Sequence, residues 1–299
     1  MSRLCEGRVA IVTGAGRGVG REHALLLAAH GAKVVVNDIG AAVDGSGKDT
    51  SPASEVVAAI KKAGGEAVAN GEDVSSWKGA KALIDAAIAH FGKLDILINN
   101  AGILRDRMLT NMDESEWDSV IQVHLKGTFA PSRHAAAYWR DESKKIGGPV
   151  KGRIINTSST SGIYGNVGQT NYGAAKAGIA AFTIIAAREL RRYGVTVNAI
   201  SPTALTRMTE GLRQLTPEEA AIRDPKWVSP TVVYLASEEA QDITGRVIQA
   251  GLGRIAVCEG WRRGAEVGQV ADPATAGSLV REMITKVRKN SGMDGLELD

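Results

Sequence analysis

The sequence predicts an α/β fold, a single domain in which helices cover both faces of one doubly wound parallel sheet. Two observations carry this prediction. Short apolar runs rich in β-branched residues alternate with longer stretches of helical periodicity, as is typical of parallel sheets. The chain has 299 residues, of which 44% are hydrophobic and 23% charged, so it is long and apolar enough for one large core.

The expected elements follow from this alternation. Strands are predicted at residues 8–13, 33–36, 66–69, 94–98, 153–157, 196–200 and, as the last strand, 247–249. Helical sequence is predicted after the first strand as far as Gly31, and at 54–62, 77–91, 112–141 (with an interruption near Gly127) and 174–191. A polar loop at 39–52, rich in Gly and Ser, is unusually long for a link between a strand and a helix.

Charge, cysteine usage and apolar runs exclude several classes of protein. The 36 Lys and Arg against 33 Asp and Glu give a net charge of +3, too small to indicate nucleic-acid binding. Cys5 and Cys258 stand at opposite ends, so neither a disulfide framework nor a metal site is expected. Residues 1–7 predict no signal peptide, and no stretch approaches the ~20 apolar residues of a membrane span. These features favour a cytoplasmic protein.

The first strand runs into a glycine-rich turn. Gly14, Gly18 and Gly20 follow Thr13 in the pattern T-G-x-x-x-G-x-G, and helical periodicity begins at once. Glycines let the backbone approach a pyrophosphate, and the N-terminus of a helix supplies amide donors and a positive dipole. A strand, a glycine turn and a helix in this order predict a dinucleotide-binding site.

A second group of residues has the chemistry of proton transfer. Tyr172 and Lys176 lie four residues apart at a helix, so their side chains point to the same face. An ammonium beside a phenol favours the phenolate and lowers the phenol's pKa from near ~10 towards the working pH, which makes it a proton donor and acceptor. Ser159 follows the strand at 153–157, and a loop with three glycines lets its hydroxyl meet the phenol over one substrate oxygen.

Together with the glycine motif, Ser159 and Tyr172-x-x-x-Lys176 resemble the catalytic signature of the short-chain dehydrogenase/reductase family. Asp73-Val74 resembles the family's pair beside the adenine, and Asn99-Asn-Ala-Gly102 resembles its signature where the cofactor crosses the strand ends. The resemblance implies a Rossmann-type sheet and covers roughly the first five-sixths of the chain. The cofactor contacts that it implies come from Gly14, Arg17, Gly18, Val19, Gly20, Asp38, Asp73, Val74, Asn99, Ala101, Gly102, Tyr172, Lys176 and Pro202.

Two charged residues bear on the choice of dinucleotide. Asp38 ends the second strand about 20 positions past the glycines, where an acid accepts hydrogen bonds from the adenosine ribose and repels a 2′-phosphate. Arg17 favours the phosphate, because a basic residue at this place is common in NADP-using relatives. We give Asp38 the greater weight, so NAD is expected and NADP is the alternative.

The sequence departs from the family pattern at two places. His124 stands where the family has an asparagine that bends a helix and helps a proton relay. A lone histidine on such a helix is more often structural, so His124 is an open candidate for the relay and is not counted among the catalytic residues. Pro202-Thr203 replaces the usual Pro-Gly, which leaves the details of the nicotinamide contact open.

Finer motifs resemble one branch of the family. The segments Val36-Asn-Asp-Ile-Gly40, Gly102-Ile-Leu-Arg-Asp-Arg107 and Ser161-Gly-Ile-Tyr-Gly-Asn166 are similar to the (3R)-hydroxyacyl-CoA dehydrogenase domain of multifunctional enzyme type 2, also called a 17β-hydroxysteroid dehydrogenase. The resemblance implies a free-standing enzyme of lipid metabolism that acts on a fatty or sterol side chain. It also implies a homo-oligomer, either a dimer or a tetramer.

The expected function is therefore the NAD-dependent oxidation of a secondary alcohol to a ketone on a 3-hydroxyacyl-CoA. Tyr172 is expected to be the base, Lys176 to lower its pKa and hold the nicotinamide ribose, and Ser159 to orient the substrate oxygen. An NADP-dependent 3-oxoacyl reductase, a hydroxysteroid dehydrogenase and, remotely, a non-catalytic dinucleotide sensor are the alternatives. Three arginines are expected either to meet the phosphates of CoA or to pair with local acids such as Asp106 and Glu210. They are Arg105, Arg107 and Arg207.

Two regions complete the expected organisation. Residues 1–258 form the dinucleotide-binding and catalytic domain, in which 206–221 is expected to be a mobile helical flap over the substrate. Residues 259–299 are a C-terminal extension with one amphipathic helix. That helix starts at Asp272-Pro273 and has an apolar face for packing on the protein's own body or on a neighbouring subunit.

Overall fold

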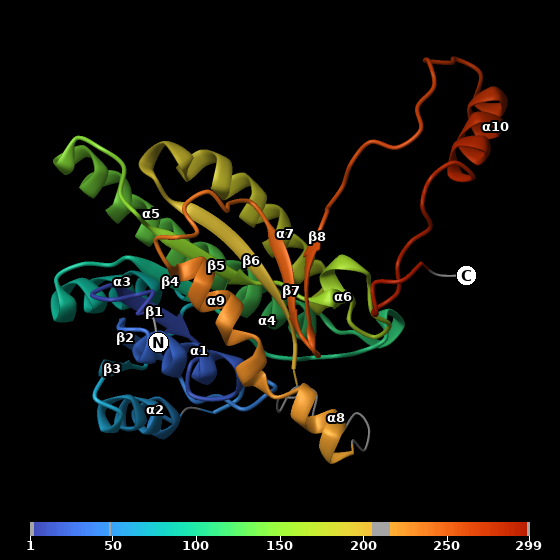
Figure 1. Ribbon diagram of the computed structural model, residues 1–299. Coiled ribbons are helices and arrows are strands. Elements are labelled where there is room, and N and C mark those ends of the chain that lie inside the picture. The colour runs from blue at the N-terminus through green and yellow to red at the C-terminus, as the bar shows by residue number, and fades with distance from the viewer. Residues whose placement is uncertain (1–2, 48, 205–215, 298–299) are drawn as a thin grey trace. The chain divides into compact units, whose positions relative to one another are not determined.

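The computed structural model describes residues 3–47, 49–204 and 216–297, and the chain divides into two compact units, Met1–Cys258 and Glu259–Asp299. The first unit is built on one eight-stranded sheet in the order β3-β2-β1-β4-β5-β6-β7-β8 (Figure 1). Its strands are β1 Val9–Thr13, β2 Lys33–Asn37, β3 Glu66–Asn70, β4 Ile96–Asn99, β5 Arg153–Thr157, β6 Thr196–Thr203, β7 Val247–Gly251 and β8 Arg254–Cys258.

Neighbouring strands from β3 through β7 pair in parallel, and β8 alone runs antiparallel, against β7. The predicted α/β fold with a doubly wound parallel sheet is confirmed, and the structure adds one antiparallel strand. The expectation that the strand at 247–249 is the last one is wrong, because β8 returns along it. The hairpin turn contains Leu252 at φ 52° and Gly253 at φ 69°. Hairpin turns of this kind usually have the sequence Asn-Gly or Asp-Gly, so Leu-Gly did not indicate a turn in the sequence.

Helices connect the strands and cover both faces of the sheet. They are α1 Gly18–Ala29, α2 Ser51–Lys62, α3 Trp77–Phe91, α4 Glu114–Val120, α5 Gly127–Ile146, α6 Thr160–Ile163, α7 Thr170–Leu190, α8 Pro217–Ile222 and α9 Ser229–Ala236. Short helical turns are η1 Leu109–Asn111, η2 Ile121–Lys126, η3 Arg191–Tyr193 and η4 Pro225–Trp227. Figure 1 shows α1 and α9 side by side, with α2 next to α1.

The two faces of the sheet build two cores, because successive side chains of a strand point to opposite sides. In β1, Ala10 and Val12 pack with residues of α1, α2 and α9. Val9 and Ile11 pack on the other face with residues of α3, α5 and α7. Every residue of β1 is therefore buried, which explains why its sequence is continuously apolar instead of alternating.

Two helical predictions need correction. The stretch expected as one interrupted helix at 112–141 is α4, a π-helical turn η2 just before Gly127, and α5, which continues to Ile146. The helix expected from residue 174 is α7, which begins at Thr170, so Tyr172 lies inside its first turn. Of the predicted flap at 206–221, residues 206–215 lie outside the described residues, and the rest includes the start of α8.

In the second unit, the described residues 259–297 contain one helix, α10 Pro273–Ile284. The carboxylate of Asp272 accepts a hydrogen bond from the Thr275 amide at 2.8 Å, and Pro273 occupies the first turn, so the helix starts with a side-chain cap. None of the helices within the described ranges is long and apolar enough to cross a membrane.

Candidate active site

The glycine turn after β1 is fastened to the end of β4. The side-chain amide of Asn100 donates to the carbonyl oxygens of Thr13 and Gly14 at 3.0 and 3.1 Å. The Thr13 hydroxyl accepts in turn from the backbone amides of Asn100 and Ala101 at 2.9 and 3.1 Å. A Cβ at Gly20 would overlap the carbonyl oxygen of Gly14, so only glycine permits this approach. The result is a backbone cradle at the start of α1 that fits a pyrophosphate.

Asn100 was missed by the sequence prediction, although it stands inside the Asn-Asn-Ala-Gly signature. Its neighbour Asn99, which was predicted to bind the cofactor, is 3% exposed, and its side chain points into the core. There its amide donates to the Ser132 hydroxyl and the Asn156 side-chain carbonyl, both at 2.9 Å. The Asn99 side chain therefore ties β4 to β5 and α5, which leaves only its backbone for a cofactor.

Asp38 lies directly beside the glycine turn. One carboxylate oxygen accepts from the amide of Gly16 at 2.7 Å, and the other accepts from the amide of Gly40 at 2.7 Å. Asp73 instead holds its own turn, since its carboxylate accepts from the amide and hydroxyl of Ser75 at 2.9 and 2.8 Å. The neighbouring Val74 is buried in the core. Asp38 is thus the acid placed to meet a ribose at the cradle.

The structure brings the three predicted catalytic side chains together. Tyr172 and Lys176 lie one turn apart in α7, and the Lys176 ammonium is 5.5 Å from the centre of the Tyr172 ring. The Ser159 side chain, at the N-cap of α6, lies close enough to the Tyr172 hydroxyl to lower its pKa. A Cβ at Gly162 would lie 2.5 Å from the Ala177 amide nitrogen, so the missing side chain lets the Ser159 loop rest on α7.

The pKa values of this group are shifted by burial. Burial raises the pKa of Tyr172, while the hydrogen bond from Ser159 opposes the shift and the charge of Asp106 adds to it. Burial also lowers the pKa of Lys176 to about 7. The net shift is opposite to the lowering that the sequence predicted, and a lowering contribution from Lys176 stays a prediction. The Lys176 ammonium donates a hydrogen bond to the Thr157 carbonyl at 2.7 Å.

His124 is packed against the same phenol. It lies in the π-helical turn η2, is 2% exposed, and meets the Tyr172 ring edge-on with centroids 5.1 Å apart. Its Nε2 lies 3.1 Å from the amide nitrogen and 2.7 Å from the carbonyl oxygen of Ile103. Burial lowers the pKa of His124 to about 3, so the ring is neutral at physiological pH. The ring therefore joins the segment after β4 to Tyr172, and a role in a relay stays a prediction.

The two described arginines of the expected CoA-binding group already have partners. Arg107 forms an ion pair with Glu116 at 2.9 Å, and not with Asp106. Arg105 donates to the Asp44 carbonyl at 2.7 Å. Arg207 lies outside the described residues. Any contact of Arg105 or Arg107 with a phosphate therefore competes with these bonds, which weakens the argument from free positive charge.

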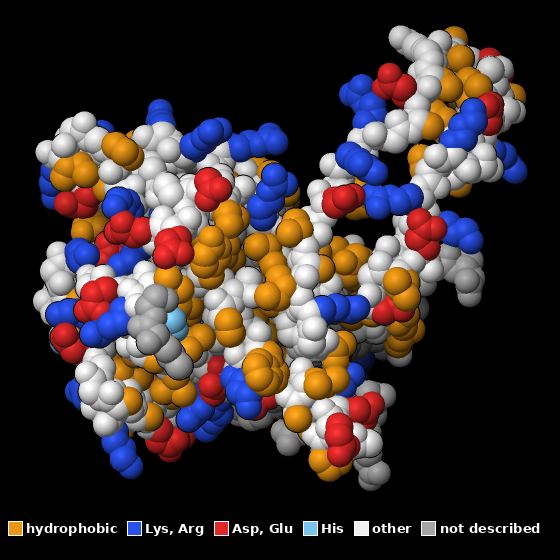
Figure 2. Space-filling model, viewed as in Figure 1, with side chains coloured by type: hydrophobic (Ala, Val, Ile, Leu, Met, Phe, Trp, Pro, Cys, Tyr) orange, Lys and Arg blue, Asp and Glu red, His pale blue; other side chains and the backbone are white. Residues whose placement is uncertain are grey.

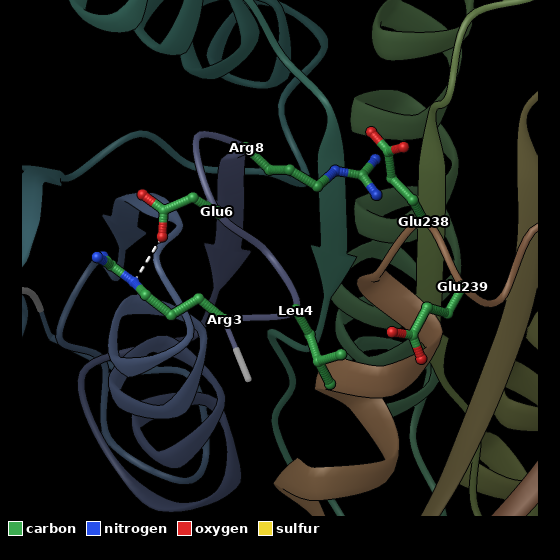
Figure 3. Close-up of a pocket in the computed structure, with 6 residues that line it drawn as sticks. All are labelled: Arg3, Leu4, Glu6, Arg8, Glu238 and Glu239. Carbon is green, nitrogen blue, oxygen red and sulfur yellow. Dashed lines mark ion pairs between the residues drawn. The ribbon is translucent and has the colours of Figure 1, made fainter. Parts of the chain in front are cut away.

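A cavity of about 270 Å³ lies at the other end of the sheet. Arg8 lines it and immediately precedes β1, whereas the glycine turn follows β1. Figure 3 shows Arg3 paired with Glu6, and Arg8 pointing toward Glu238. The Arg8 guanidinium donates to the carbonyl at the end of α9, so its charge is used to hold the chain together. Ligands of open α/β sheets bind at the carboxyl ends of the strands, which is where the cradle and Tyr172 lie.

The described ranges contain no group of three or more His, Cys, Asp or Glu side chains that could hold a metal ion. A dinucleotide fits the residues better. The backbone cradle, the acid at its edge and the buried Tyr–Lys pair lie along the carboxyl ends of β1, β2, β4 and β5. The nicotinamide of such a cofactor supplies hydride chemistry, for which the protein provides alignment.

Known proteins resemble this chain over most of its length. Residues 8–219 match the short chain dehydrogenase family. Hydroxyacyl-CoA dehydrogenase ChsB1 of Mycobacterium tuberculosis is 50% identical over 246 residues, which are 81% of this chain and 76% of that protein. Peroxisomal multifunctional enzyme type 2 of Drosophila melanogaster is 49% identical over 249 residues, which are 83% of this chain and 39% of the longer protein.

A solved structure agrees with these similarities. The crystal structure of a short chain dehydrogenase from Mycobacterium avium has a TM-score of 0.86 and 51% sequence identity, and the match covers 96% of this chain and 98% of that one. The predicted family and the resemblance to multifunctional enzyme type 2 are confirmed. The chain belongs to the short-chain dehydrogenase family and is an NAD(P)-dependent oxidoreductase that acts on a CH–OH group.

Proposed function

We propose that this short-chain dehydrogenase oxidises the 3-hydroxyl of a 3-hydroxyacyl-CoA to a ketone with NAD, in the metabolism of a fatty or sterol side chain. The convergence of Ser159, Tyr172 and Lys176 supports the reaction type. The names of the relatives support the substrate class, since one is a hydroxyacyl-CoA dehydrogenase. Asp38 at the cradle supports NAD over NADP, since its carboxylate repels a 2′-phosphate.

In this reaction the Tyr172 phenolate takes the proton of the substrate hydroxyl while Ser159 holds the same oxygen. A nicotinamide held at the cradle would supply the acceptor for the hydride of that carbon, so that the products would be the ketone, NADH and a proton. Lys176 lies one helical turn after Tyr172, and its pKa of about 7 lets its amine exchange a proton near neutral pH. Because the ring of His124 is neutral and fixed to Ile103, it keeps the phenol in place without adding charge.

The test is the formation of NADH by the purified protein with a panel of 3-hydroxyacyl-CoAs, the matching free hydroxy acids, simple secondary alcohols and hydroxysteroids, each with NAD and NADP. The proposal expects the CoA thioesters with NAD to give the highest kcat/KM. Equal rates with free steroids or alcohols would overturn the acyl-CoA assignment. A higher kcat/KM with NADP would overturn the NAD assignment, and the reaction type would stand in both cases.

We also propose that residues 1–258 are the catalytic domain of a cytoplasmic homo-oligomer, a dimer or a tetramer, and that 259–299 is an extension to it. Trp77 and Phe129 are half exposed on α3 and α5 with ring centroids 5.9 Å apart, and Ile185 is exposed on α7. Figure 2 shows hydrophobic side chains gathered over α9, β7 and β8. The edge strand β8 exposes Ile255 and Val257, and exposed apolar edges are usually covered. A monomer in light scattering at micromolar concentration would contradict this assembly.

A further inference from the structure

The long loop after β2 returns to the strand it leaves. The amide of Asp49 donates to the Ile39 carbonyl at 3.0 Å, so ten residues later the chain is again beside the end of β2. Gly40 has φ 69°, and a Cβ there would overlap the carbonyl oxygen of Asp49. Only glycine allows this approach. The loop therefore brings a second acid to the neighbourhood of Asp38.

The chain continues from Asp49 along the glycine turn. A Cβ at Gly16 would lie 2.7 Å from Cβ of Pro52 and 2.8 Å from the Asp38 carboxylate. On the other side, Thr50 lies 3.8 Å from the position of a Cβ at Gly71, just after β3. Residues 49–52 thus form one wall of the space between the glycine turn, β2 and β3, where the adenosine ribose of a dinucleotide binds in this fold.

The carboxylate of Asp49 is held ionised at this wall. It accepts hydrogen bonds from the amide and the hydroxyl of Ser51 at 2.9 and 2.7 Å, and these bonds lower its pKa, with a further contribution from the charge of Arg17. The charge of Asp49 therefore acts on Arg17, while the Asp38 carboxylate lies at the amide of Gly16, the residue before Arg17.

We propose that Asp49 is a specificity-determining residue that disfavours a 2′-phosphate by offsetting the charge of Arg17 and adding to the repulsion from Asp38. The inference rests on the proposed NAD-dependent function and names a residue that decides the cofactor. A 2′-phosphate brings about −1.5 to −2 charges, while the ribose hydroxyl of NAD brings none. Two carboxylates against one guanidinium leave a net negative field at the place where that phosphate binds.

The experiment compares Asp49→Asn with Asp44→Asn. Asp44 is a matched control, because it stands in the same loop and accepts from the amide and hydroxyl of Ser46 at 2.9 and 2.7 Å, but its neighbouring cation is Arg105. The dissociation constants of NADH and NADPH are measured by fluorescence at low salt. Asp49→Asn is expected to raise the affinity for NADPH relative to NADH by about tenfold, whereas Asp44→Asn changes this ratio less than about twofold. The gain should shrink in high salt.

Arg17→Gln is added to the wild type and to Asp49→Asn to test the mechanism. Part of the gain in NADPH affinity from Asp49→Asn should disappear in the double variant, because no guanidinium remains whose charge Asp49 could offset. The proposal is overturned if Asp49→Asn leaves the NADPH-to-NADH affinity ratio within about twofold of the wild type, or if Asp44→Asn raises it equally. A wild type that already prefers NADPH would overturn the NAD assignment made above. The change that Asp49→Asn makes in the NADPH-to-NADH affinity ratio would still decide whether Asp49 disfavours the 2′-phosphate.

Discussion

The contact between Gly102 and His124 offers a sharp test of the packing behind the site. A Cβ at Gly102 would overlap Cε1 of His124 and lie 3.0 Å from Nδ1 and 3.2 Å from Nε2. These three nearest atoms all belong to the one ring, and Gly102 is not among the positive-φ glycines. Alanine at position 102 therefore conflicts with the imidazole and not with its own backbone.

The ring cannot move aside without cost, because Nε2 is bound to Ile103 and the ring edge lies on Tyr172. Relief needs a shift of roughly 1 Å, given ordinary carbon contacts of about 3.5 to 4.0 Å. Overpacking of this kind costs about 1–3 kcal/mol, which lowers Tm by about 2–4 °C per kcal/mol in a domain of this size. Because the displaced ring pushes on Tyr172, Gly102→Ala should also reduce kcat by at least about tenfold.

A double-mutant cycle with His124→Ala, followed by urea unfolding, separates this clash from other effects. The double variant should be more stable than the sum of the two single changes by about 1–2 kcal/mol, because removal of the ring makes room for the methyl group. Gly148→Ala is the control, since a Cβ there meets nothing within 4 Å. Additivity within about 0.5 kcal/mol would refute the reasoning that His124 is the barrier.

Three other predictions follow from the site. Asp106 raises the pKa of Tyr172, so Asp106→Asn should move the alkaline rise of kcat/KM for alcohol oxidation to lower pH; a pH–rate profile that is unchanged or moves to higher pH would contradict this. The pKa of Lys176 falls from 10.5 to about 7 on folding, so the unfolded chain binds more protons between these values and stability rises with pH across that window. Lys176→Met should therefore abolish turnover and yet raise Tm at pH 7. A lower Tm of the variant in calorimetry would contradict this prediction. Asn100→Ala should weaken NADH binding about tenfold, because its bonds to the glycine turn are lost. Asn99→Ala should chiefly lower Tm, because its bond to Ser132 lies in the core. Binding titrations and melting curves that show the reverse pattern would be inconsistent with this geometry.

The glycine turn and the catalytic group were predictable because their geometry is local. Thr13 to Gly20 form a strand end, a turn and a helix start in unbroken sequence, and this order alone defines the cradle. Tyr172 and Lys176 share a helix face by their spacing. The glycines of the loop also predicted that Ser159 would reach the phenol, and the structure adds that this approach depends on the absence of a side chain at Gly162.

Other features depend on contacts between distant segments. Asn99 and Asn100 point to opposite sides as neighbours at a strand end must, but only the folded sheet decides which of them faces the glycine turn. The pairing of Arg107 with Glu116 depends likewise on α4 and its capping box. The direction of the Tyr172 pKa shift was missed, because burial cannot be read from the spacing of a Tyr and a Lys.

In the proposed oxidation of a 3-hydroxyacyl-CoA, Tyr172 takes the proton of the substrate hydroxyl. The most direct measurement is NADH formation from NAD and a 3-hydroxyacyl-CoA by the wild type and by Tyr172→Phe, with NADH affinity measured on both proteins. We expect rapid turnover by the wild type and a loss of at least about a thousandfold in the variant. The NADH affinities of the two proteins should agree within a few-fold, because the change removes one hydroxyl and little volume. Turnover by Tyr172→Phe close to that of the wild type would contradict this role of Tyr172.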